Sequence, residues 1–208
     1  MPAADRIEPH TAAVRLVRAN ALDQVSHHHR GGTDLPPANW TMYRELTAAL
    51  ESWQAAGTLP EDSLALTEWL AVELTAYILL QLDQDHARLH RWLLDHGEGV
   101  RQAQQHQHPA GPTTVEILSA VAADAAARSD QPAAAERLVR IAVPYLSYLR
   151  PGREVEDARE VALTLGQWAG ANLAGLTVFG GDRVHAYLNH RAAARNAHPQ
   201  LPTDGSRP

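Results

Sequence analysis

Cysteine and lysine are absent from the chain, and phenylalanine occurs once in 208 residues. The lack of cysteine excludes a disulfide framework, thiolate ligands for zinc and a thiol nucleophile. The 18 basic side chains other than histidine are all arginine. Selection for bidentate arginine contacts is one explanation, whereas the alanine-rich composition favours codon bias in a GC-rich genome.

Several motifs that would identify an enzyme or a family are also missing. There is no phosphate-binding P-loop, no dinucleotide-binding glycine fingerprint and no nucleophile elbow. No segment has the alternation of a β-hairpin, and no internal repeat occurs. The first twenty residues hold five charged side chains and no apolar segment typical of a signal peptide. We therefore expect a cytoplasmic protein.

The abundant residues, alanine and leucine, favour helix because their side chains lose little entropy there. Hydrophobic residues make up 45% of the chain, enough to bury a core. The composition predicts an all-α bundle of about six or seven mostly antiparallel helices. We expect a single domain over residues 1–197, with a weak division near residues 101–112, followed by a disordered tail at residues 198–208.

Helical periodicity and capping residues place these helices along the chain. Thr58 with Glu61, and Thr113 with Glu116, have the spacing of a capping box at a helix start. Asn39 is a further candidate N-cap. In the helix that follows Asn39, one face is predicted to carry Trp40, Tyr43, Leu46, Leu50 and Trp53. The predicted helices cover residues 9–25, 39–56, 58–82 (in the alternative continuing to 96), 113–128, 132–150, 153–179 and 183–196.

The negative charge is concentrated in one part of the chain. The net charge is −6, and residues 45–87 contain eight Asp or Glu and no arginine. Such a stretch repels a phosphate backbone, because binding to nucleic acid depends on clustered basic side chains. The composition therefore makes nucleic acid an unfavourable partner, and a solvated acidic face is the simplest interpretation.

Asp83, His86 and His90 form the first candidate site. Their spacings of three and four place all three on one side of a helix, provided that the helix is unbroken. Carboxylate and imidazole groups at such spacing can bind a divalent metal. The alternative is that His86 packs on the leucine stripe of the same helix. Adjacent histidines at residues 27–29, and His106 with His108, lie in polar segments and are not expected to converge on one ion.

Glu73 is the one carboxylate in the apolar run from Trp69 to Leu80. Burial would raise its pKa, which is common at functional sites. The alternative places Glu73, Tyr77, Gln84 and Arg91 on a helix edge that reaches water. The sequence favours this second interpretation.

Gly166, Gly170 and Ala174 recur every four residues in a segment without charged side chains. Each glycine inside a helix costs about 1 kcal/mol relative to alanine, so a row of small residues implies close approach of another backbone. We expect a packing surface, either within the chain or at the two-fold axis of a homodimer. A membrane span is disfavoured because Gln167 and Asn172 dilute the apolar run.

The last candidate is a cluster of Pro144, Tyr145 and Tyr148. A proline inside a helix frees a backbone carbonyl and can kink the helix, so this cluster is a candidate pocket. Curvature of the bundle, with the tyrosines at the surface, is the alternative.

These observations lead to two functional hypotheses. The first is a non-enzymatic interaction or regulatory protein that acts through protein–protein contacts, with a homodimer as one alternative and no cofactor. The second is a helical protein that binds a small molecule or a divalent metal, or a metal-dependent enzyme, using Asp83, His86 and His90 or the Pro144–Tyr148 pocket. The arrangement of these side chains in space distinguishes the two.

Overall fold

The structure, a computed structural model, describes residues 6–31, 39–103, 109–126 and 133–196. These residues form helices without strands, which confirms the all-α class. The described helices number eight rather than six or seven. They are α1 (Pro9–His29), α2 (Trp40–Ala56), α3 (Leu59–Gln81), α4 (His86–Ala103), α5 (Gly111–Ala126), α6 (Ala133–Tyr148), α7 (Glu154–Leu176) and α8 (Gly181–Asn196).

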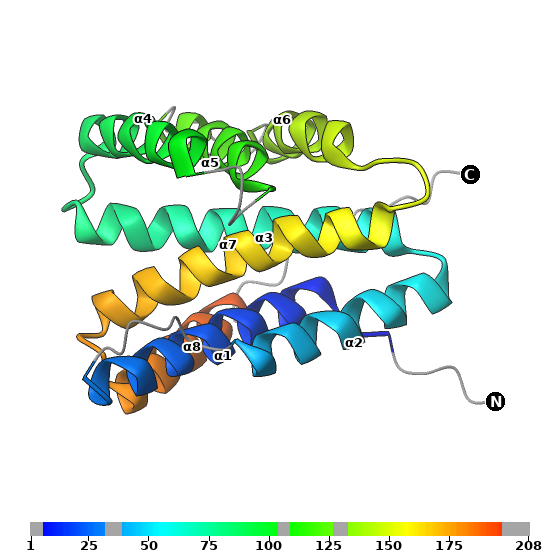
Figure 1. Cartoon of the computed structure of the whole chain (residues 1–208). Helices are drawn as coiled ribbons and strands as arrows, with labels where there is room; N and C mark the ends of the chain where they lie inside the picture. Colours follow the sequence, from blue (N-terminus) through cyan, green and yellow to red (C-terminus); the bar gives the residue numbers. More distant parts are fainter. Residues whose placement is uncertain (1–5, 32–38, 104–108, 127–132, 197–208) are drawn as a thin grey trace, which may run out of the picture.

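The helices form three layers (Figure 1). Helices α3 and α7 lie side by side in the middle and pack on each other. Helices α1, α2 and α8 pack on one side of this pair, whereas α4, α5 and α6 form a layer on the other side. Within that second layer α5 lies between α4 and α6 and contacts both of them.

The row of small residues on α7 is closed by α1 within the same chain. A Cβ atom added at Gly170 would lie 2.6 Å from Cβ of Asn20 and 2.8 Å from the backbone nitrogen of Ala21. At Gly166 it would lie 3.3 Å from the sulfur of Met42, and Ala174 is fully buried. The predicted close approach is therefore present between α7 and α1, so the row does not offer a surface to a second copy.

The third helix ends at Gln81, and the alternative in which it continues to residue 96 is wrong, because the chain turns between α3 and α4. Asp83 and Gln84 have φ angles of 55° and 61°, in the left-handed region, so the helix cannot continue through them. The Asp85 carboxylate then accepts the N–H groups of Ala87 (2.9 Å) and Arg88 (3.0 Å) and caps α4. The apolar stripe gave no sign of this turn, because leucines on both sides of the turn pack on the core.

Several predicted helix ends also need correction. Thr58 precedes α3 as expected, but its hydroxyl donates to the carboxylate of Asp62 rather than forming a capping box with Glu61. Thr113 and Glu116 lie inside α5, which begins earlier, at Gly111. Asn39 occupies the N-cap position of α2 without a side-chain cap bond, because its side chain accepts a hydrogen bond from Asn20 (2.7 Å).

Two further predictions are wrong: the buried face of α2 and the end of α1. Trp40 is 77% exposed and Tyr43 is also exposed, so the buried face of α2 is defined by Met42 with Leu46, Leu50 and Trp53. Helix α1 continues to His29 instead of ending at Val25. The ring of His28 stacks on Phe179 at 4.1 Å, which ties the end of α1 to the turn between α7 and α8.

Two ion pairs with buried carboxylates fasten the ends of the helices. Asp62 on α3 accepts hydrogen bonds from Arg6, which precedes α1. Asp157 in the first turn of α7 is fully buried and accepts the backbone N–H (2.7 Å) and Nε (3.0 Å) of Arg150. The arginine partners lower the pKa of both carboxyl groups below the usual range.

One described helix, α3, is long and apolar enough to cross a membrane by length and composition alone. The most apolar 18-residue window of α3 has a mean hydropathy of 1.4, and 56% of that window is buried inside the bundle. A core helix in the middle layer has the same properties. A weak division of the chain was expected near residues 101–112. The described residues at the two ends of this segment belong to α4 and α5, and these helices pack on each other. The tail at residues 198–208 lies outside the described residues.

Candidate functional site

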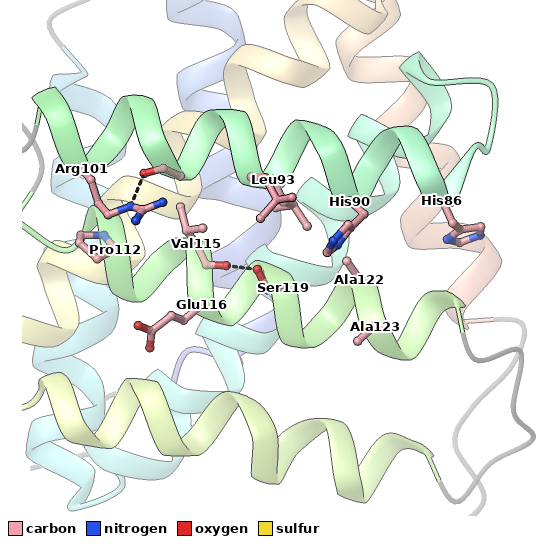
Figure 2. A pocket seen from close by; sticks show the side chains of 12 residues that line it. His86, His90, Leu93, Arg101, Pro112, Val115, Glu116, Ser119, Ala122 and Ala123 are labelled. Atoms are coloured by element: carbon pink, nitrogen blue, oxygen red, sulfur yellow. Dashed lines mark hydrogen bonds between the residues drawn. The ribbon is translucent and has the colours of Figure 1, made fainter.

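The principal candidate is a cleft between α4 and α5, with a volume of about 570 Å³ (Figure 2). Both helices contribute side chains to it along most of their length. The lining residues are His86, His90, Leu93, Leu94, Gly97, Arg101, Pro112, Val115, Glu116, Ser119, Ala122 and Ala123.

Small side chains on α5 create this space. Ser119, Ala122 and Ala123 are spaced by three and one residues, so they share one side of α5. Their small side chains leave space between α5 and α4. Near the other end, a Cβ atom added at Gly97 would lie 3.1 Å from a methyl group of Val115, so α4 and α5 touch there. The cleft is therefore open over the alanines and narrow at Gly97.

The polar groups of the cleft are separated along α4. His86 and His90 lie one helical turn apart, as their spacing predicted, and both line the cleft. The Nδ1 atom of His86 is buried without a hydrogen-bond partner. Arg101 lies eleven residues beyond His90, or about 16 Å along the helix axis. The cleft thus has imidazole groups at one end and a guanidinium group at the other.

Arg101 is held in place by its own helix. Its Nε donates to the carbonyl of Gly97 (3.2 Å), and Nη2 lies 3.1 Å from a carboxylate oxygen of Glu98. The carboxylate of Glu116 points away from α4 (Figure 2). The Arg101 side chain is more than half exposed, and its guanidinium group retains N–H groups that can bind a ligand.

The predicted metal set is not brought together. Asp83 lies in the turn before α4, its side chain is 91% exposed, and it pairs with Arg88 at 3.7 Å. Only the two histidines share the cleft. Among the described residues, no three His, Asp or Glu side chains come together as a metal site. His106 and His108 lie outside the described residues.

Glu73 lies in the interior and not on a water-facing edge. Its side chain is 13% exposed, and Oε1 lies 2.7 Å from Nη2 of Arg191 on α8. Burial and then the charge of Glu73 raise the pKa of the neighbouring Tyr77 well above its usual value. Gln84 and Arg91, which were expected to share this side, belong to the α3–α4 turn and to α4. Glu73 thus links α3 to α8.

The two tyrosines of the Pro144 cluster have partners inside the bundle. The hydroxyl of Tyr145, which is fully buried, donates to Oγ of Ser63 at 2.7 Å. Burial raises its pKa to about 12. Tyr148 donates to the carboxylate of Glu160 on α7. The two side chains therefore hold α6 against α3 and α7, and neither lines the cleft.

Sequence reasoning missed the partly buried His96 on α4. The imidazole of His96 stacks on Trp92 at 4.6 Å and meets Trp168 of α7 edge-on, also at 4.6 Å. Burial lowers its pKa, because the apolar surroundings disfavour the charged imidazolium. The spacing of Trp92 and His96 along the helix was visible in the sequence, but the contact with α7 was not.

No protein-family model matches the chain, and no curated protein or solved structure matches it either.

Proposed function

We propose that this chain is a non-enzymatic binding protein that holds a small organic molecule with an anionic group in the α4–α5 cleft. The observation that carries the proposal is the volume of the cleft, about 570 Å³. Binding sites for small molecules usually have about 300–1,000 Å³ and combine apolar walls with a few polar groups.

The chemistry of the lining selects the class of ligand. Leu93, Leu94 and Val115 provide an apolar wall, which suits a hydrocarbon or aromatic body. The guanidinium group of Arg101 can form paired hydrogen bonds with a carboxylate, sulfonate or phosphate group. The imidazole groups of His86 and His90 supply hydrogen bonds at the opposite end. An elongated molecule with an acidic end group satisfies all three features.

The hydrogen bonds within the cleft support binding rather than nucleophilic catalysis. Among the described residues that line the cleft, Ser119 has the only hydroxyl, and it donates to the carbonyl of Val115 at 2.8 Å. Its proton is thus directed along its own helix and not toward a histidine, whereas an activated serine donates to its base.

The first test uses 8-anilinonaphthalene-1-sulfonate, which combines an aromatic body with a sulfonate group. We expect the wild-type protein to bind the dye in the cleft, and Ala123→Leu to weaken binding at least tenfold because the leucine fills the space. Ala125→Leu is the matched control, because Ala125 is an exposed alanine of the same helix outside the cleft. Fluorescence titration measures both. Equal affinity in the two variants would contradict the proposal.

The second arm tests the charge of the ligand. Decanoate should compete with the dye, and decyltrimethylammonium, which has the same chain and the opposite charge, should compete at least tenfold less well. Arg101→Gln should remove this preference while the melting temperature stays within a few degrees of wild type. Competition by both compounds to the same extent in the wild-type protein would exclude an anion site.

The hypothesis of a protein–protein contact remains a second candidate, and one observation favours it. Helix α6 carries exposed apolar residues at positions 138, 139, 143 and 146. A protein partner, with regulatory consequences, would use this surface rather than the cleft.

A further inference from the structure

The exposed side of α6 carries a row of apolar residues beside the exposed Glu136, Arg140 and Ser147. Val139 is 64% exposed, Val143 63% and Leu146 51%. Their spacings of four and three residues place them in one row along the helix. We call these three residues, together with Ala142 between them, the α6 row.

The α6 row faces away from the core. Ile141 and Tyr145 are fully buried and define the inward side of α6. Val139 and Val143 each lie two residues before one of them, a rotation of about 200° around the helix at 3.6 residues per turn. Packing of the single chain therefore does not explain why these positions are apolar, since a helix facing water normally carries polar residues there.

We propose that the α6 row binds a second copy of this chain, with the two α6 helices antiparallel across a two-fold axis. In an antiparallel pair centred between Ala142 and Val143, Val139 lies opposite Leu146 of the second copy. Ala142 then lies opposite Val143 of the second copy. Each bulky residue meets an apolar residue, and the row is complementary to itself, as a two-fold interface requires.

The charges at the ends of α6 favour the antiparallel direction. Glu136 lies in the first turn of α6, and Arg150 follows its last turn. Both side chains are more than half exposed, although within the chain Glu136 pairs with Arg140 at 3.0 Å and Arg150 pairs with Asp157. Antiparallel pairing brings Glu136 of one copy toward Arg150 of the other, whereas parallel pairing places like charges together. Antiparallel helix dipoles also attract each other.

The size of the surface sets the expected strength. A stable dimer usually buries about 800 Å² on each partner, and one helix face provides less. We therefore expect a dimer that dissociates on dilution through the micromolar range. The proposal does not depend on the cleft, because the α6 row and the cleft have no residue in common.

The absence of cysteine makes cross-linking a direct test of orientation. Val143→Cys places a thiol beside the proposed axis, so its oxidation should produce a disulfide-linked dimer. Glu136→Cys is the control, because two copies of residue 136 lie about 20 Å apart in the antiparallel pair, from 13 residues at 1.5 Å each. Cross-linking of Val143→Cys alone supports the proposal. Cross-linking of both variants, or of Glu136→Cys alone, overturns it.

Molar mass measured over a range of concentrations tests the unmodified interface. The wild-type protein should approach dimer mass near 100 μM, by our estimate for an interface of this size. Val143→Asp should remain monomeric with an unchanged circular dichroism spectrum. Val178→Asp makes the same substitution at an exposed valine in the α7–α8 turn and should still dimerise. A wild-type protein that stays monomeric at all concentrations would overturn the proposal. A monomer is also the result expected if another segment of the chain or another protein covers the α6 row.

Discussion

Replacement of Gly170 with alanine is expected to destabilise the fold by about 3 kcal/mol, the upper part of the usual range for overpacking. The added Cβ atom would lie 2.8 Å from the backbone nitrogen of Ala21, so α1 or α7 must move. For a chain of this size the melting temperature should fall by about 6–12 °C. Thermal unfolding followed by circular dichroism measures the change, and Gly170→Leu should be worse.

Two other glycines of α7 provide matched controls. At Gly166 the closest atom is the sulfur of Met42, a flexible side chain that can move, so Gly166→Ala should have a smaller effect than Gly170→Ala. A Cβ atom added at Gly175 would have no neighbour within 4 Å outside the adjacent backbone of its own helix. Gly175→Ala should raise stability by up to about 1 kcal/mol, because alanine has the higher helix propensity. If Gly170→Ala were neutral or stabilising, α7 would not be packed closely against α1.

Replacement of Asp157 with asparagine should lower the free energy of unfolding by about 2–3 kcal/mol at neutral pH, because the acceptor loses its charge and one of its two acceptor oxygens becomes an NH2 donor that faces Arg150. The fully buried carboxylate accepts the backbone and side-chain N–H groups of Arg150. Urea unfolding at pH 7 measures the difference. Glu156→Gln is the control, because Glu156 is the exposed neighbour in the same helical turn.

The same variant should alter the response to acid. Hydrogen bonds from Arg150 hold the pKa of Asp157 below its usual value. The folded state therefore binds a proton less readily than the unfolded state, and stability falls as the pH drops below the ordinary carboxyl pKa of about 4. The gap in stability between wild type and Asp157→Asn should narrow between about pH 4 and the lower pKa of the folded state. A constant gap over that interval would show that the charge is unimportant.

The sequence predicted helices well where local signals were sufficient. Gly57 ends α2 with a φ of 72°, and the Thr58–Pro60 segment begins α3. The turn at Asp83 and Gln84 was missed because two residues other than glycine adopt positive φ there, an uncommon conformation without a clear composition signal. The N-cap Asp85 was the available signal.

The candidate site was only partly accessible from the sequence, because it depends on contacts between distant segments. The spacing of His86 and His90 placed both on one side of α4 correctly. Ser119 and the alanines of α5 form the other wall, and their role depends on how close α4 lies. Glu73 was misinterpreted for the same reason, since its partner Arg191 lies 118 residues further along the chain.

The layered arrangement implies that the free energy of local unfolding differs between parts of the fold. Helices α3 and α7 are enclosed on both sides, so they cannot open without disrupting the whole molecule. The α4–α6 layer contacts the middle pair through α5 and through the hydrogen bonds of Tyr145 and Tyr148 on α6. We expect this layer to separate as a unit while the middle pair and α1 remain associated. Such a partly open form would expose the inner side of α5 and α6 to proteases and chaperones before global unfolding occurs.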